Sequence, residues 1–221
     1  MPSLKDSSFG EALILSAGLS EDNLAFWRLE DTTDSSPNGN TLTNNNSVQF
    51  VAGKIGNCAE FNGTNNFLRL GSFSTSFDAS SPYSVSAWHN ITTLKDFFTL
   101  AGCSTAQSLH IHGNASGALA VNNSQTADIS IASFFVTGEW HHLVVTRNSS
   151  GILKVYKDAS LVYNAVQGVT YGSVPNIQLG ALQGNASFFM SGKLDAVGLW
   201  TRELDQTEVN QLYNGGVGLQ I

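Results

Sequence analysis

The sequence predicts an all-β protein, a two-sheet antiparallel β-sandwich or jelly roll with one short C-terminal helix. Short apolar segments recur along the chain between turns rich in Gly, Asn, Ser and Thr. This is the pattern of a sandwich or jelly roll with about twelve to fourteen strands. Charged residues make up only 12% of the 221 residues, while Gly occurs 21 times, as in β-proteins with many turns. Neither a linker nor an internal repeat interrupts this pattern, so we expect a single domain.

The predicted elements follow a polar N-terminal arm at residues 1–22, and the domain itself spans residues 23–221. Each expected strand is a run of β-branched, aromatic or other apolar residues bounded by turn formers. A helix is expected at residues 207–214, where Val209, Leu212 and Tyr213 recur at helical spacing. The expected strands are 23–30, 49–52, 58–61, 66–70, 83–90, 97–103, 109–112, 118–122, 129–131, 140–147, 152–157, 161–163, 176–179 and, after a lead-in at 188–190, 192–200.

One acidic residue, Asp195, lies inside the apolar last strand, between Leu194 and Trp200. A buried carboxylate is costly unless it is paired, hydrogen-bonded or bound to a cation. The other dense polar segment is the turn-forming loop 31–40, which directly follows the first strand. If the carboxylate meets this loop, the last strand lies beside the first. We therefore expect the two ends of the domain to be neighbours in one sheet.

Charge and hydropathy argue against two classes of partner. The net charge of −7 and the lack of any basic run disfavour nucleic acid. The apolar stretch 11–17 is too short to cross a bilayer, so membrane insertion is not expected. The arm also lacks the charged-then-apolar pattern of a signal peptide. We expect the protein to reach an extracellular surface or a virion after assembly or lysis.

The cysteines and histidines form no convincing metal or redox motif. Cys58 and Cys103 lie in apolar, strand-like segments without a Cys-x-x-Cys partner, which favours buried free thiols over a disulfide. His110 and His112 share one face of a strand, where they could bind zinc only if a third ligand came from elsewhere. We therefore expect no metal site built on histidine.

Several segments match a family pattern in a fixed order. They are 25–29 with 34–40, 53–57 with 61–63, 83–88, 139–146, 153–156, and 192–200 with 202–204 and 211–213. The set covers about residues 23–213 and resembles the laminin-G-like domains of concanavalin A-like jelly rolls, in particular their bacterial and viral subgroup. The resemblance implies the same two-sheet fold. One departure is the hairpin turn Lys-Asp-Ala at 157–159, where the family usually has Asn-Gly.

The resemblance also implies a structural calcium site at Asp34, Asn38, Gly39 and Asp195. Calcium takes six to eight oxygen ligands from carboxylates, amides and backbone carbonyls, and a Gly-containing turn can aim carbonyls at one point. Such an ion would hold the first strand to the last. The alternative is that Asp34 and Asn38 make only turn hydrogen bonds, while Asp195 accepts from backbone N–H groups.

Proteins of this family serve as lectins, adhesion modules and accessory domains of enzymes, so the fold alone leaves the function open. The four Trp residues all fall at family positions that indicate core packing. A ring that stacks on a sugar would therefore have to come from Phe98, Phe134, Tyr171 or Phe188, which we place in loops. For each of these rings, core or interface packing is the alternative.

No strand carries the pair of carboxylates that glycosidases of this fold use, because Glu60, Glu139 and Asp195 each stand alone. We therefore expect a non-enzymatic recognition or adhesion module, most plausibly for a glycan such as a cell-surface polysaccharide, displayed on a larger assembly. The alternatives are a structural phage virion decoration or tail protein and, less favoured, a glycosidase. The apolar patch 12–15 of the arm suggests contacts within a homo-oligomer, or docking on its own domain.

Overall fold

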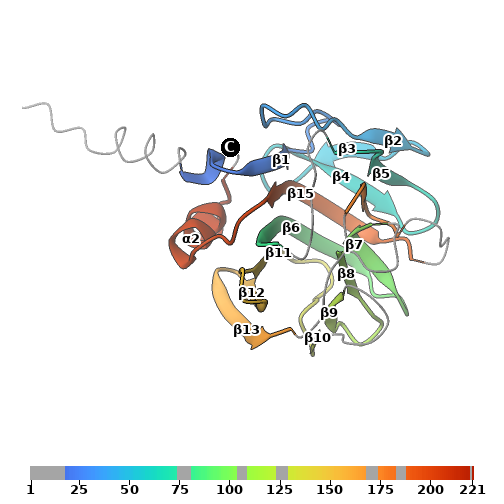
Figure 1. Ribbon diagram of the computed structural model, residues 1–221. Coiled ribbons are helices and arrows are strands. Elements are labelled where there is room, and N and C mark those ends of the chain that lie inside the picture. The colour runs from blue at the N-terminus through green and yellow to red at the C-terminus, as the bar shows by residue number, and fades with distance from the viewer. Residues whose placement is uncertain are drawn as a thin grey trace, which may run out of the picture.

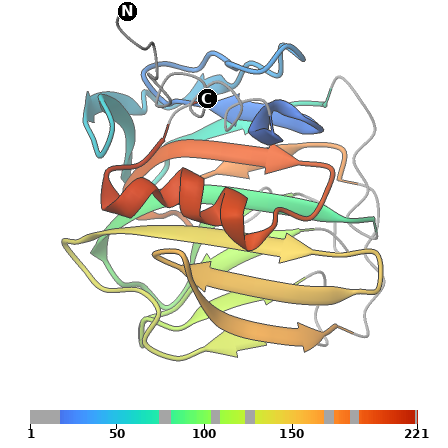
Figure 2. The ribbon, with the colours of Figure 1, turned by 90° about the vertical axis from the view of Figure 1, so that its left-hand side faces the viewer.

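The computed structural model is a sandwich of two antiparallel sheets with one short helix, α2 (Gln206–Tyr213), near the C-terminus (Figures 1 and 2). This confirms the predicted fold class. No helix within the described residues is long and apolar enough to cross a bilayer. The structure describes residues 18–73, 81–103, 109–122, 129–167, 174–182, 188–219 and 221.

The larger sheet has eight strands. In spatial order they are β13 (Ser160–Val166), β12 (Ile152–Lys157), β11 (Trp140–Arg147), β6 (Tyr83–Thr93), β15 (Ser191–Trp200), β4 (Asn57–Asn62) and β3 (Gln49–Ala52), with β1 (Asn23–Trp27) also paired to β15. The second sheet has seven strands: β10 (Ile129–Ile131), β9 (Leu119–Asn122), β8 (His110–Gly113), β7 (Phe98–Gly102), β14 (Ile177–Leu179), β5 (Phe67–Leu70) and β2 (Thr43–Asn45).

The first and last strands are neighbours, as predicted. β1 runs antiparallel to β15, with Phe26 opposite Gly198 and Trp27 opposite Val197. β15 also pairs with β4 and β6, so it lies at the centre of the eight-stranded sheet. A β-bulge interrupts its pairing with β6 after Asp195, where Ala196 adopts a positive φ of 46°.

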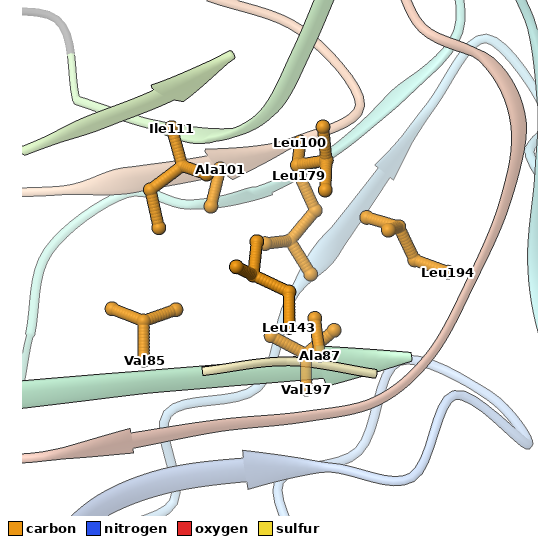
Figure 3. A pocket seen from close by; sticks show the side chains of 9 residues that line it. All are labelled: Val85, Ala87, Leu100, Ala101, Ile111, Leu143, Leu179, Leu194 and Val197. Atoms are coloured by element: carbon orange, nitrogen blue, oxygen red, sulfur yellow. The ribbon is translucent and has the colours of Figure 1, made fainter. Parts of the chain in front are cut away.

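The core lies between the inner faces of the two sheets. In β6, Val85 and Ala87 point into this core, while Trp88 points to the opposite face, as the two-residue period of a strand requires. A small cavity at the centre of the core is lined only by apolar side chains (Figure 3). They are Val85, Ala87, Leu100, Ala101, Ile111, Leu143, Leu179, Leu194 and Val197.

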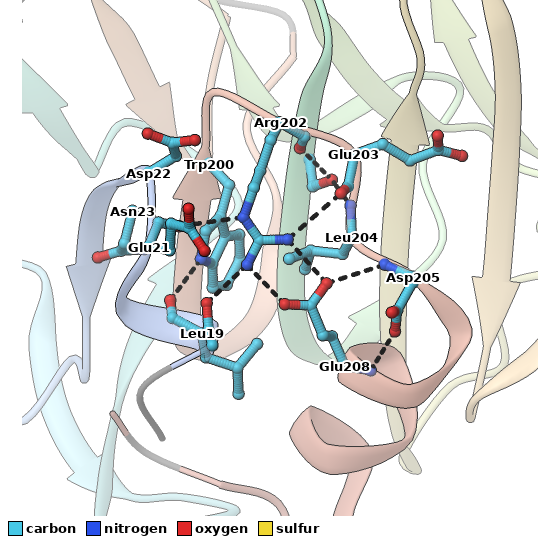
Figure 4. Close-up of polar contacts among 12 residues, drawn as sticks. Leu19, Glu21, Asp22, Asn23, Trp200, Arg202, Glu203, Leu204, Asp205 and Glu208 are labelled. Atoms are coloured by element: carbon cyan, nitrogen blue, oxygen red, sulfur yellow. Dashed lines mark hydrogen bonds and ion pairs between the residues drawn. The ribbon is translucent and has the colours of Figure 1, made fainter. Parts of the chain in front are cut away.

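The outer face of the eight-stranded sheet is covered by α2 and by residues 18–22 (Figures 2 and 4). Leu19 is fully buried there, and its carbonyl accepts a hydrogen bond of 2.7 Å from the indole Nε1 of Trp200. Arg202 donates to the carbonyl of Gly18 at 2.7 Å and forms an ion pair with Glu208 of α2. Residues 18–22 of the predicted arm therefore dock on their own domain, whereas the patch 12–15 lies outside the described residues.

The predicted core residues are mostly where we expected them. Trp27, Trp88 and Trp200 are buried, whereas Trp140 is only half-buried. Both cysteines are buried and free, which confirms that prediction. Burial and the nearby Asp195 carboxylate raise the pKa of the Cys58 thiol to about 12, so this thiol is not a reactive thiolate at neutral pH.

Two hairpin turns are organised by the same asparagine chemistry. In the β8–β9 turn and the β11–β12 turn, the side-chain Oδ1 of Asn114 or Asn148 accepts backbone N–H bonds from the residues two and four positions further on, at 2.9–3.1 Å. The fourth residue of each turn is a glycine, Gly117 or Gly151, with φ of 75° or 77°. These are Asx turns, in which the side chain mimics a backbone turn.

Candidate functional site

Of the residues implied as calcium ligands, Asp34 has both carboxylate oxygens engaged in hydrogen bonds to its own loop and to β1. Oδ1 accepts from the backbone N–H groups of Phe26 and Ser36 at 2.9 Å. Oδ2 accepts from the N–H of Asn40 at 2.7 Å and from the Ser36 hydroxyl at 2.8 Å. Asn38 also acts as a donor, since its amide Nδ2 bonds the carbonyls of residues 23 and 24. Asp34 thus makes the turn hydrogen bonds given as the alternative above, and both side chains also bond the backbone of β1.

Asp195 lies in a different hydrogen-bond network. Its Oδ2 accepts from the backbone N–H groups of Lys54 and Ile55 at 2.8 and 2.9 Å, while its Oδ1 is buried without a hydrogen-bond partner. Burial raises the pKa of the Asp195 carboxyl to about 6, because desolvation disfavours its charged form. Among the residues that the structure describes, no group of three or more His, Cys, Asp or Glu side chains is placed to hold a metal ion. The calcium site remains a prediction.

The four rings proposed as sugar platforms do not form one surface. Phe98 and Phe134 are 0% and 2% exposed and both pack against Phe135, with ring centroids 5.1 Å apart. Both rings belong to the core, the alternative given above for each of them. Tyr171 lies outside the described residues. Phe188 is half-buried and is part of the cluster described next.

An aromatic cluster lies on the outer face of the seven-stranded sheet, around Phe97. This ring is 47% exposed, and its centroid lies 5.4 Å from that of Phe188 and 5.6 Å from that of His112. His112 in turn stacks on His110 at 4.4 Å, and a ring nitrogen of His110 pairs with the hydroxyl of Thr99 at 2.9 Å. The exposed ring is therefore supported from two sides by other ring systems.

Sequence analysis missed Phe97, although the signal was present. Phe97 directly precedes Phe98, the first residue of β7, and successive side chains of an extended chain point to opposite faces. One of the two rings therefore had to point outward. Phe98 is the inward ring and Phe97 the outward one.

A row of polar side chains crosses the same face. Arg69 of β5 is the register partner of Thr43 on one side and of Gln178 on the other. Gln178 is in turn opposite Gly102, and Gly102 is opposite His110. Paired positions in a sheet present their side chains to the same face, so these groups lie in one line across the strands. Thr43 is exposed and Arg69 and His110 are half-buried, whereas Gln178 between them is buried, with 3% of its surface exposed.

The two sheets differ in the charged residues that their strands carry. None of the residues that form the seven strands β2, β5, β7, β8, β9, β10 and β14 is Asp or Glu, and these strands contain Arg69, His110 and His112. The eight-stranded sheet, by contrast, carries Glu60 and Asp195. The strands of the seven-stranded sheet therefore carry no acidic residue, although the chain as a whole has a net charge of −7.

Histidines of the eight-stranded sheet have a structural role. His142 is buried among Trp88 and Tyr213, its Nε2 pairs with the Ser86 hydroxyl at 2.8 Å, and burial lowers its pKa to about 3. His89 is fully buried, and desolvation lowers its pKa well below the usual value. Neither ring is accessible to a ligand from solvent.

Comparisons with solved structures agree with the fold. The binding domain of Paraclostridial Mosquitocidal Protein 1 is 18% identical with a TM-score of 0.74, and the match covers 90% of this chain and 53% of that one. A structure of botulinum neurotoxin type C, whose cell entry depends on two ganglioside molecules, is 13% identical with a TM-score of 0.71, over 92% and 53%. The chain thus spans about half the length of these structures.

A third structure has almost the same extent as this chain. Domain 4 of an extracellular arabinanase from Geobacillus stearothermophilus, in complex with arabinotriose, is 21% identical with a TM-score of 0.68, over 90% of this chain and 98% of that one. A search of the curated proteins found no match. A family match covers residues 62–210, two thirds of the chain. The chain therefore belongs to the concanavalin A-like lectin/glucanases superfamily.

Proposed function

We propose that this protein is a non-enzymatic glycan-binding module that binds its ligand on the outer face of the seven-stranded sheet. The observation that carries the proposal is the half-exposed ring of Phe97, supported by His112 and Phe188 beside a row of hydrogen-bonding side chains. A sugar offers an apolar face to such a ring and hydroxyl groups to such a row. Apolar contact with a few precisely placed polar groups is the usual composition of a ligand site.

The chemistry of this face favours binding over hydrolysis. Glycosidases require two carboxyl groups on either side of the scissile bond, and the seven strands contribute no Asp or Glu. The structural neighbours are mainly binding domains. One of them is in complex with arabinotriose, and another belongs to a toxin whose cell entry depends on gangliosides. These likenesses support the proposal through the shared fold.

A glycan array read with the wild-type protein, Phe97→Ala and Leu161→Ala tests the proposal. Phe97 and Leu161 are both 47% exposed, but Leu161 is on β13 of the other sheet, so it is a matched control. Loss of a ring that becomes buried against a sugar is expected to weaken binding about tenfold or more. Equal binding by all three proteins would place the ligand elsewhere, and no binding to any glycan would contradict the function.

We also propose that the module acts as part of a larger assembly or homo-oligomer. The contacts of residues 18–22 with Trp200 and Arg202 tie the start of the described chain to its own sandwich. A variant lacking residues 1–17 therefore keeps these contacts and tests the arm alone. Sedimentation velocity should show a smaller species for the truncated chain. Identical sedimentation of both chains as monomers would contradict the assembly role.

A further inference from the structure

Arg69 is a cation without a protein partner in the polar row. No ion pair within the described residues involves it, and its Nε is buried without a hydrogen-bond partner. Arg202, by contrast, is held by both carboxylate oxygens of Glu208 at 2.5 and 2.7 Å. None of the acidic residues that the structure describes forms an ion pair with this half-buried guanidinium. A half-buried guanidinium without a carboxylate partner among the described residues can accept an anionic ligand.

The neighbours of Arg69 can hydrogen-bond or stack but cannot neutralise it. Thr43 and Gln178 flank it in the adjacent strands and supply hydroxyl and amide groups. Phe67 lies two residues earlier on the same face, with its ring 6.3 Å from that of Phe189. The surroundings of the guanidinium are therefore polar, partly aromatic and free of carboxylates within the strands.

We propose that the glycan bound by this face is acidic and that Arg69 binds its carboxylate. This inference rests on the proposed function. Arginine presents a rigid fork of N–H donors that matches a carboxylate in a bidentate pair. With a net charge of −7, most of the protein repels an anionic polymer. The strands of the seven-stranded sheet contain Arg69 and no acidic residue, so this surface offers a positive charge to an anion.

The position of Arg69 also sets the extent of the ligand. Arg69 and His110 belong to the same row but are separated by three strand spacings, from β5 through β14 and β7 to β8. At about 4.8 Å per spacing, the two side chains start about 14 Å apart. This is longer than one sugar ring. Arg69 and the cluster around Phe97 therefore contact different sugar units of an oligosaccharide.

The experiment compares matched acidic and neutral glycans on one array. The pairs are polygalacturonate with its full methyl ester and sialyllactose with lactose, and sulfated heparin is added as a different anion. The proteins are the wild type, Arg69→Gln, Arg69→Lys and Arg28→Gln. Arg28 is exposed and bonds the carbonyl of Ile221, so its substitution removes the same charge away from this face.

The wild type should bind one acidic glycan at least tenfold more tightly than its neutral partner, and the preference should weaken with salt. Arg69→Gln should abolish the preference, Arg69→Lys should keep part of it, and Arg28→Gln should behave as wild type. Equal binding of acidic and neutral forms, unchanged in Arg69→Gln, would overturn the inference but leave the glycan-binding function intact. A preference for heparin alone would overturn the carboxylate assignment. Absence of any binding would contradict the proposed function as well.

Discussion

The two outer faces of the sandwich differ in how far their aromatic rings are exposed among the described residues. On the eight-stranded sheet, Trp88 and Trp200 are buried because α2 and residues 18–22 pack over them. On the seven-stranded sheet, Phe97 keeps 47% of its surface exposed and Arg69 has no partner within the described residues. Aromatic side chains therefore stabilise the fold on one face, whereas on the other face one ring is half-exposed.

The largest expected difference between the faces is in stability. Trp200→Ala removes a buried indole, its hydrogen bond to the Leu19 carbonyl and its edge contact with Phe26 at 6.4 Å. We expect it to lower the free energy of unfolding by about 3–5 kcal/mol. Phe97→Ala, on the exposed face, should lower it by less than about 1 kcal/mol. Urea unfolding of both variants measures the two values, and similar losses would mean that Phe97 is also part of the core.

Lowering the pH should destabilise the fold through His142, on the face that α2 covers. The pKa of His142 is lowered from 6.5 to about 3, so the folded state favours the neutral ring. The stability that this ring contributes is present above pH 6.5 and is lost as the pH falls toward 3, by about 3 kcal/mol between pH 6.5 and 4. His142→Gln keeps a partner for Ser86 but cannot titrate. Its unfolding free energy should depend less on pH than that of the wild type in this range, and parallel curves would contradict the assignment.

Asp195 should have the opposite pH dependence. Its pKa is raised from 3.8 to about 6, so the folded state favours the protonated carboxyl. This contribution to the free energy of unfolding is present in full below pH 3.8 and is lost as the pH rises through 6. The total loss is about 3 kcal/mol, of which about 2 kcal/mol falls between pH 4 and 6.5. It partly cancels the loss caused by His142. Asp195→Asn should therefore steepen the acid loss of stability, which urea unfolding at pH 4 and 6.5 would show.

The same position tests the predicted calcium site. A bound ion would keep Asp195 ionised and raise the melting temperature by mass action. Calcium should then raise the melting temperature of the wild type, and Asp195→Ala should abolish this rise. An unchanged melting temperature in calcium and in chelator would contradict the site.

The smallest expected effect is at the β12–β13 turn. Asp158 and Ala159 have φ values of 52° and 63°, the left-handed region that favours glycine. The Asp158 carboxylate pairs with the His141 ring at 2.7 Å and accepts from the His142 N–H at 2.8 Å, and these contacts offset the strain of its positive φ. Ala159 has no such contact, and Ala159→Gly should stabilise the fold by up to about 1 kcal/mol. A loss of stability would show that packing of its methyl group outweighs the strain.

Much of the fold could be predicted because strand periodicity is local. The pairing of the first and last strands was also predicted, but the reason given for it differs from the contacts observed. Asp195 takes its hydrogen bonds from Lys54 and Ile55, not from the loop 31–40. An isolated acid shows that a partner is needed without showing which one.

The proposed face could not be predicted in the same way. Arg69, Gln178 and His110 are far apart in sequence and become neighbours only through the order of β5, β14, β7 and β8. Which side chains of β7 and β8 point to the outer face was also ambiguous, because the β7–β8 pairing shifts register after Thr99. Alternation predicts that one of two successive rings points outward but does not say which.

The Asx turns have a consequence for how this protein should be produced. Asn114-Ala-Ser and Asn148-Ser-Ser satisfy the acceptor pattern for N-linked glycosylation. Their Asn residues are explained by the hydrogen bonds of Oδ1 within each turn. A eukaryotic secretory host would nevertheless recognise both triplets and attach sugars to these exposed turns. Since the turn at Asn114 joins two strands of the proposed binding face, material for binding assays should come from a host without this modification.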